Sequence, residues 1–257
     1  MNTLTLKPSR LFALGRSELT LLVRNRAALS LALLMPLAMV FGLKASLSQY
    51  DLEGGAAAVG EATLTGGIGM VLILVVYMNL VSAYVARREE LVLKRLRTGE
   101  ANDLEILAGS TLPSGVLALT QVAVLVAAGA ATMDVRTPQN PVLLLAAVLA
   151  GFVLLAAMAA ATSSFTRNVE SAGLTTLPLF LASIVGSGMF VPIEMMPEAV
   201  ASVCELLPLS GVMELVRAGW TGTGEAYDLM GAALTTLAWM VITVFAVQRW
   251  FRWEPRR

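Results

Sequence analysis

The chain has 257 residues, of which 57% are apolar and only 14% are charged, and its 18 basic residues balance its 18 acidic residues. A water-soluble domain of this length needs far more polar surface, with charges that recur along the exposed face of each helix. Here the charges form clusters that are separated by long apolar tracts. This pattern excludes one large soluble core and predicts a membrane protein.

Six apolar tracts predict an all-α protein that crosses a membrane six times. A helix needs roughly 20 apolar residues to cross the hydrocarbon layer of a bilayer, and each tract reaches about that length. Small residues crowd several of them, and in lipid such residues let helix backbones pack closely. The predicted spans are Ala27–Leu47, Leu64–Ala86, Thr111–Met133, Pro141–Ser163, Ala172–Val191 and Leu229–Gln248.

The N-terminal part of the chain predicts an interfacial helix followed by the first span. Leu11–Val23 has a broad apolar face, so residues 1–26 are expected to lie along the cytoplasmic surface of the bilayer. The first tract contains Pro36, which membrane helices tolerate when neighbours cover the freed carbonyl. A cleaved signal peptide is the alternative, but Lys44 lies where a cleavage site should be uncharged. We therefore expect an uncleaved span.

The positions of the basic residues predict the orientation in the membrane. With six spans and a cytoplasmic start, fifteen of the 18 Lys and Arg residues fall on the cytoplasmic side. Acidic residues gather on the other side, in residues 51–61 and 194–228. The positive-inside rule therefore places both termini in the cytoplasm of a bacterial cell. Because the basic residues border a membrane, they do not indicate nucleic-acid binding.

Several kinds of catalytic site are excluded by the residues that the chain lacks. It has no histidine and one cysteine, Cys204, which is expected to be a small buried side chain. A histidine metal site, a Ser-His-Asp triad and a Cys-His pair therefore cannot be built from this chain alone. None of its three lysines lies in a Gly-Lys-Ser/Thr context, so it has no phosphate-binding loop. We expect no catalytic residues, metal or cofactor in this chain, and any energy for transport must come from elsewhere.

A cytoplasmic segment of mixed charge, Arg87–Leu107, follows the second span. It predicts two short helices that are broken at Thr98-Gly99, the second opened by a capping box of Asn102 and Glu105. On the first of these helices Val92, Leu93 and Leu96 share one side, although Leu91 spoils a clean division. An ordinary charged loop is the alternative. The amphipathic pattern favours a docking element for a partner.

A second unusual segment, residues 192–228, follows the fifth span on the outer side. Pro192, Pro197 and Pro208 interrupt an apolar stretch that also contains glutamates, and Ala199–Leu207 predicts a short helix. Such a segment is too short and too broken to cross the bilayer, so it predicts a re-entrant or interfacial element. A plain exposed loop is the alternative, but it would hardly need so many apolar residues.

These two segments, in this topology, resemble the membrane subunit of a type-2 ABC exporter, the permease class that includes daunorubicin-type drug exporters. The first family motif is carried by Glu90, Leu93, Leu96, Arg97 and Thr98. The second is carried by Gly188, Pro192, Pro197, Leu207, Pro208, Leu209 and Arg217. The chain departs from the motifs at Gly99, at Leu91-Val92 and at Ser210-Gly211. The resemblance implies one transmembrane domain over residues 1–257.

The resemblance also implies partners and a mechanism. A separate ABC subunit would bind ATP and Mg²⁺, and two copies of this permease would pair with two such ATPases. The segment after the second span would be the coupling helix, with Leu93 as its apolar anchor; its implied contact residues are Glu90, Leu93, Lys94, Arg95, Leu96, Arg97 and Thr98. The outer element would gate the exit during alternating access. Its implied residues are Gly188, Pro192, Glu194, Pro197 and Pro208.

The cargo is less well specified than the mechanism. Candidate path-lining residues are Asn79, Ser82, Tyr84, Gln121, Thr175, Thr176, Ser183 and Ser187, although each can equally serve in hydrogen bonding between helices. Few charges lie in the spans, which favours a hydrophobic or amphipathic cargo, such as a drug or antibiotic, over a small ion. A lipid-linked or glycan-linked cargo is the alternative within the ABC class. A non-ABC carrier or channel would need more polar residues in its spans.

Overall fold

The structure is a computed structural model, and it describes residues 34, 38, 41, 42, 45, 55–98, 102–132, 135–189 and 196–254. The described residues form helices and connecting turns without a strand, which confirms the predicted all-α class. The predicted interfacial helix of residues 1–26 lies outside them. So do most of the first span, Gly99, Pro192 and Glu194.

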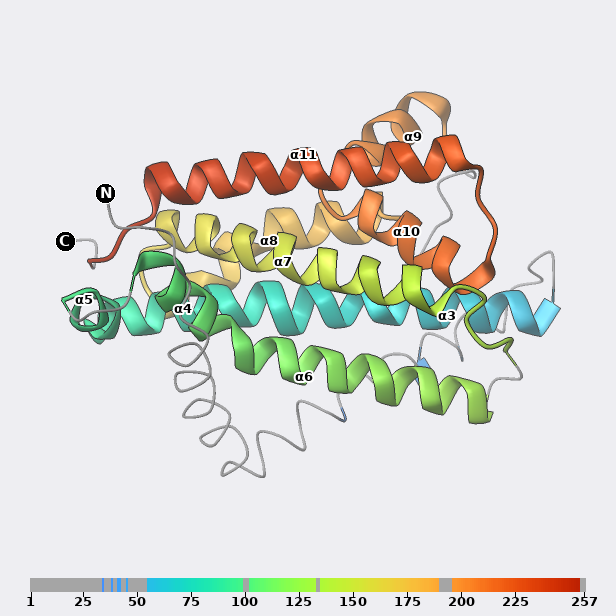
Figure 1. The fold of residues 1–257 in the computed structure, drawn as a ribbon, viewed down its shortest axis with the longest axis horizontal. Coiled ribbons are helices and arrows are strands. Elements are labelled where there is room, and N and C mark those ends of the chain that lie inside the picture. The colour runs from blue at the N-terminus through green and yellow to red at the C-terminus, as the bar shows by residue number, and fades with distance from the viewer. Residues whose placement is uncertain are drawn as a thin grey trace.

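The helices form an elongated bundle in which most elements run parallel or antiparallel to one long axis (Figure 1). Five of them are long and apolar enough to cross a membrane among the described residues, and one bent pair of short helices adds a sixth candidate. In chain order the elements are α3 (Gly55–Val71), η1 (Leu72–Met78), α4 (Asn79–Glu89), α5 (Val92–Arg97), α6 (Asp103–Thr132), α7 (Pro141–Phe165), α8 (Val169–Gly186), α9 (Glu198–Glu205), α10 (Ser210–Thr221) and α11 (Ala226–Trp250).

The second span is the central pillar of the bundle and is longer than the sequence predicts. It runs without a break through α3, η1 and α4, and its middle section η1 is a π-helix. The side chains of Leu72, Val76 and Tyr77 are fully buried there. In Figure 1 this pillar runs the length of the molecule, with α6 on one side and α7, α8, α10 and α11 on the other. Any movement of the pillar therefore reaches most of the other spans.

Two further spans each have one boundary that differs substantially from the prediction. The third begins at Asp103 rather than Thr111, because the predicted short helix of the capping box continues directly into the span through Pro113. The fifth, α8, ends at Gly186 rather than Val191. The turn that ends it contains Gly188 with a φ of +68°, a conformation that glycine adopts without steric cost. The prediction placed the end of this span too late, because the residues beyond Gly186 are apolar and hydropathy alone does not indicate a turn.

The helices α9 and α10 form the bent pair, with an angle of 91° between them. The indole N–H of Trp239 donates to the carbonyl of Leu206, at the bend, over 2.8 Å. Trp239 lies thirteen residues into α11, which corresponds to about 20 Å along that helix. The bend therefore reaches roughly the midpoint of α11, a position that fits a broken span or a re-entrant element, and the predicted re-entrant geometry stays a prediction.

Of the two helices, α10 is buried in the bundle, whereas the sequence predicts that the whole segment of residues 192–228 lies on the outer side. Its glycines allow this packing: a Cβ on Gly211 would lie 2.5 Å from the carbonyl oxygen of Ala232 on α11. A Cβ on Gly219 would lie 2.6 Å from the backbone nitrogen of Leu144 on α7. The amides of Gln139 and Asn140 also donate to the carbonyls of Trp220 and Gly219, each over 3.0 Å. The start of α7 thus completes the hydrogen bonds at the end of α10.

This packing generates a prediction for Gly219→Ala. The new methyl group would press on the α7 backbone, which cannot move aside as a flexible side chain can. We expect a loss of stability of about 1–3 kcal/mol, the usual cost of overpacking. Gly173→Ala on α8 is the matched control, because its Cβ meets nothing within 4 Å in the described structure. Thermal unfolding of both variants in detergent measures the difference, and equal melting temperatures would contradict the packing of α10 on α7.

Candidate functional site

A buried arginine fixes the cytoplasmic end of the pillar. Arg88 on α4 is only 2% exposed, and its guanidinium donates to the carbonyls of Ser163 (2.7 Å) and Thr166 (2.5 Å) at the end of α7. The last carbonyls of a helix have no partner within the helix and carry partial negative charge, so a cation is favourable there. Arg88 therefore joins α4 to α7 at the start of the predicted coupling segment, Arg87–Leu107.

The coupling element begins with a break in the backbone. Glu90 and Leu91 separate α4 from α5, and Leu91 adopts the left-handed conformation with a φ of +59°. That conformation costs a residue with a side chain roughly 1–2 kcal/mol. It also explains why Leu91 disturbs the helical pattern of the sequence: it lies before the helix, not in it. The cytoplasmic element is thus a separate short helix set at an angle fixed by Leu91.

The structure corrects the predicted role of Leu93 as the apolar anchor for a partner. Its side chain is 0% exposed, because it packs against the rest of this chain, and so it is not available to another subunit. Leu91 is the large apolar side chain on this element that does reach the surface, with 39% exposed. Leu93 instead holds α5 against the bundle.

The other predicted contact residues of the cytoplasmic element lie at its surface. Exposed side chains are those of Glu90, Lys94, Arg95, Arg97 and Thr98, and Leu96 is half-buried. The predicted capping box is present: the Glu105 amide donates to Asn102 (2.8 Å), and the Asn102 amide donates to Glu105 (3.0 Å). Arg97 also pairs with Asp103 at 3.1 Å, which ties the end of α5 to the start of α6. The element is therefore an ordered helix with a charged surface.

The sequence reasoning missed that the C-terminal residues contact this element. Beyond α11 the chain turns toward α5, and the two lie at the same end of the bundle (Figure 1). Lys94 Nζ lies 2.9 Å from a carboxylate oxygen of Glu254, and the Arg97 guanidinium lies 5.0 Å from the ring centre of Trp253. The aromatic run Trp250, Phe251 and Trp253 beside basic residues was a signal for such a contact.

In the half of the bundle that is predicted to face outward, Arg217 of α10 holds the end of α8. Its guanidinium donates to the carbonyl of Ser187 (2.9 Å) and to the carboxylate of Glu214 (2.7 Å). The hydroxyl of Ser210 lies 3.0 Å from the carbonyl oxygen of Gly186 and 2.6 Å from that of Cys204, so its proton is shared between them. These polar groups of α10 cover carbonyls at the ends of both α8 and α9. Cys204 itself is buried, as expected.

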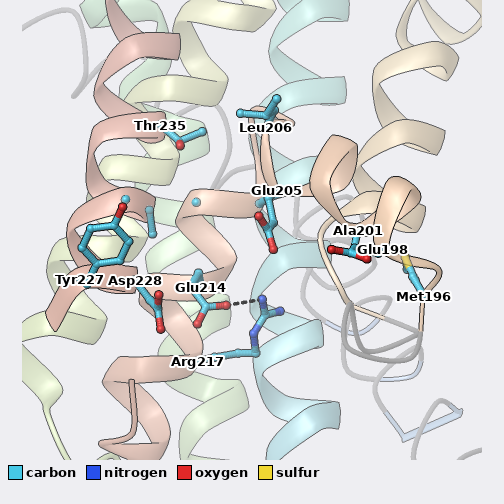
Figure 2. A pocket seen from close by; sticks show the side chains of 14 residues that line it. Met196, Glu198, Ala201, Glu205, Leu206, Glu214, Arg217, Tyr227, Asp228 and Thr235 are labelled. Atoms are coloured by element: carbon cyan, nitrogen blue, oxygen red, sulfur yellow. Dashed lines mark hydrogen bonds and ion pairs between the residues drawn. The ribbon is translucent and has the colours of Figure 1, made fainter. Parts of the chain in front are cut away.

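A cavity of about 690 Å³ lies between α9, α10 and α11 (Figure 2). Its lining includes the carboxylates Glu198, Glu205, Glu214 and Asp228, together with Arg217. In Figure 2, Leu206 and Thr235 lie at one end of the labelled residues and Arg217 lies at the other, and Asp228 belongs to the first turn of α11. Within the described part of the chain no group of three or more Cys, Asp or Glu residues is arranged to hold a metal ion.

The short helix α9 separates this cavity from the outside of the bundle. Glu198, Ala201 and Glu205 line the cavity. The apolar residues Val200 and Val203 are three positions apart, and their side chains are exposed and do not line the cavity. Residues three apart in a helix lie on one side, so α9 is amphipathic, with an apolar outer face. Pro197 precedes α9, and Pro208 lies in the turn that leads to α10.

The candidate path-lining residues are not gathered at one place. Thr176 and Ser183 are buried residues of α8, and Ser187 is the buried residue that caps its end. The hydroxyl of Thr176 donates to the carbonyl of Ala172, and that of Ser187 donates to the carbonyl of Ser183, so both bonds stay within this helix. Tyr84 is buried and donates to the carbonyl of Leu107 over 3.3 Å. Of the remaining candidates, Gln121 is buried, Ser82 and Thr175 are half-buried and Asn79 is exposed. Their role in a path stays a prediction.

Comparison with known families decides the class of this bundle. The family model described as "ABC-2 family transporter protein" matches residues 29–247, which include the described spans, the cytoplasmic element and the bent pair. The chain belongs to the ABC-2 transporter family. It is accordingly a multi-pass membrane protein and an ABC-2 type permease.

A characterised relative agrees with the family. The chain is 26% identical over 202 residues to the "Linearmycin resistance permease protein LnrN" of Bacillus subtilis (strain 168). The match covers 76% of this chain and 51% of the relative, so this permease spans about half the length of the curated protein that it matches.

Proposed function

We propose that this permease is the membrane subunit of an ATP-driven exporter and that its cytoplasmic element docks on a separate ATPase subunit. The supporting observation is the position of α5, which presents exposed charged side chains while its buried residue Leu93 fastens it to the bundle. Because α4 continues the buried pillar, a force on α5 has a direct route into the spans. The partner would bind ATP and Mg²⁺, since this chain has no phosphate-binding loop.

The proposed direction is outward, and the proposed cargo is hydrophobic or amphipathic. The cavity beside α9 supports an exit route, because it lies in the outer half of the bundle in the orientation that the basic residues favour. The relative is named a linearmycin resistance permease, so a drug or antibiotic is the class that we favour for this chain. A lipid-linked or glycan-linked compound is the second candidate.

We further propose a complex of two permeases and two ATPases, with both termini in the cytoplasm. Much of α11 is uncovered, including the exposed apolar side chains Leu234, Leu237, Val241 and Phe245. Such a surface suits lipid or a second copy of the chain. In alternating access, closure of the ATPases would turn the two permeases against each other, with the α5 elements as points of contact.

The first test concerns energy and assembly. The purified permease should not hydrolyse ATP, whereas the permease co-purified with its ATPase should do so, and a Walker lysine substitution in the partner should abolish hydrolysis. Leu91→Asp should weaken co-purification, because an unpaired carboxylate in an apolar contact costs on the order of several kcal/mol. Tyr227→Asp is the control, since Tyr227 is also largely exposed but lies in the first turn of α11, at the opposite end of the bundle from Leu91. ATP hydrolysis by the permease alone would contradict the proposal.

The second test concerns orientation. Single cysteines are introduced as Arg97→Cys and Glu225→Cys in a Cys204→Ala background, and intact cells are treated with a membrane-impermeant thiol reagent. Both native side chains are at the surface, so neither position is shielded by the protein itself. Only the cysteine at position 225 should react before the cells are opened. Reaction at position 97 in intact cells would reverse the assigned orientation and remove the support for docking through α5.

A further inference from the structure

The four residues after α11, Phe251–Glu254, form a chain of contacts between two distant parts of the sequence, and we call this segment the C-terminal strap. The Phe251 ring stacks edge-on against Tyr84 of α4, with ring centres 6.2 Å apart. The Trp253 ring packs edge-on against Phe251 at 4.9 Å and lies under the Arg97 guanidinium. Glu254 pairs with Lys94. The strap therefore contacts both α4 and α5.

Each contact alone is weak, but the series is continuous. The Lys94–Glu254 pair has more than half of each side chain exposed, and exposed pairs contribute little to stability. The aromatic contacts start from Tyr84 of α4. Its ring is buried, so its position is fixed by the surrounding side chains. From that fixed point Phe251, Trp253 and Arg97 follow one another. A shift of α5 relative to the bundle would have to break these contacts or carry the strap with it.

The backbone break at Leu91 makes this second connection important. The left-handed turn means that α5 is not a continuation of α4, so its angle is not set by the pillar alone. The strap is the direct extension of α11, whose far end contributes Tyr227, Asp228 and Thr235 to the outer cavity. Of the described candidate spans, α11 is also the least buried, although one side of it packs against α7 and α10.

We propose that the C-terminal strap couples the cytoplasmic element to α11, so that a change in the orientation of α5 reaches the outer cavity through the last span. Trp253 and Glu254 are then positioning residues: they contact neither nucleotide nor cargo, and they act by holding Arg97 and Lys94. This inference rests on the proposed function, because it takes the force on α5 from an ATPase. It adds a second mechanical route beside the pillar.

The test does not require the cargo to be known. Thr235→Cys places a reporter in the cavity in the Cys204→Ala background, and the permease–ATPase complex is reconstituted in lipid nanodiscs. The rate of labelling by an impermeant maleimide is measured without nucleotide and with ATP trapped by vanadate. With the native strap, trapping should change the labelling rate. With Trp253→Ala, the change should fall roughly fivefold, because the anchor of Arg97 is lost, while co-purification and basal ATP hydrolysis stay as before.

Two sets of variants distinguish coupling from a general disturbance. Arg252→Ala is the matched control, since Arg252 lies in the same strap and its side chain is exposed; it should leave the nucleotide response intact. Glu254→Lys should reduce the nucleotide-dependent change in labelling rate, because it places a second positive charge beside Lys94. The double variant Lys94→Glu/Glu254→Lys should recover most of it, because the pair is restored with reversed charges.

The outcomes separate this inference from the function on which it rests. A full nucleotide response in Trp253→Ala, or a charge-swapped variant that still co-purifies with the ATPase but responds no better than Glu254→Lys, would overturn the strap proposal and leave the exporter assignment standing. If the unaltered chain bound no ATPase, or if trapping never changed the labelling rate, the proposed function itself would be contradicted, and the strap proposal with it.

Discussion

The fold depends on covering the backbone carbonyls that are freed where helices end inside the bundle. Where these helix ends are buried they are out of reach of water, so each freed carbonyl needs a donor from the protein. Arg88 supplies donors at the end of α7, and Arg217 supplies one at the end of α8. Trp239 covers the carbonyl of Leu206 at the bend of the α9–α10 pair. These donors allow helices to stop partway across the bundle without a large desolvation cost.

The same constraint produces the asymmetry of the outer half. Backbone hydrogen bonds to α7 and the close approach of Gly211 and Gly219 fix α10, whereas α9 has an exposed apolar face. The cavity lies between this fixed helix, α9 and α11. A movement of α9 relative to α10 and α11 would therefore change the cavity. Such a change is what the proposed exit requires.

At the cytoplasmic end, the structure separates two roles that the sequence assigns to a single surface. Leu93 and Arg88 attach the element to the bundle, while Leu91 and the charged residues of α5 face outward. An element that is firmly attached on one side and accessible on the other can transmit the movement of a partner. The C-terminal strap would add α11 to the spans that respond.

Much of the fold could be predicted from the sequence, because long apolar tracts and capping residues act locally. The capping box of Asn102 and Glu105, the bent outer element and the burial of Cys204 are examples. What escaped prediction depends on tertiary contacts. The burial of Leu93 requires knowing which way α5 turns after Leu91, and the early end of α8 depends on a turn at Gly188. Trp253 contacts Arg97 and Glu254 contacts Lys94, and in each pair the two residues are more than 150 positions apart in the sequence.

The most direct test of this account is the depth of α9 in the bilayer. A nitroxide attached through Val203→Cys, on the exposed apolar face of α9, is placed in nanodiscs, and its collisions with oxygen and with a polar nickel chelate are compared. Because the bend lies near the middle of α11, the label should meet oxygen readily and be shielded from the chelate. Chelate accessibility equal to that of a label at Thr223, in the loop before α11, would place α9 outside the membrane and contradict the re-entrant fold.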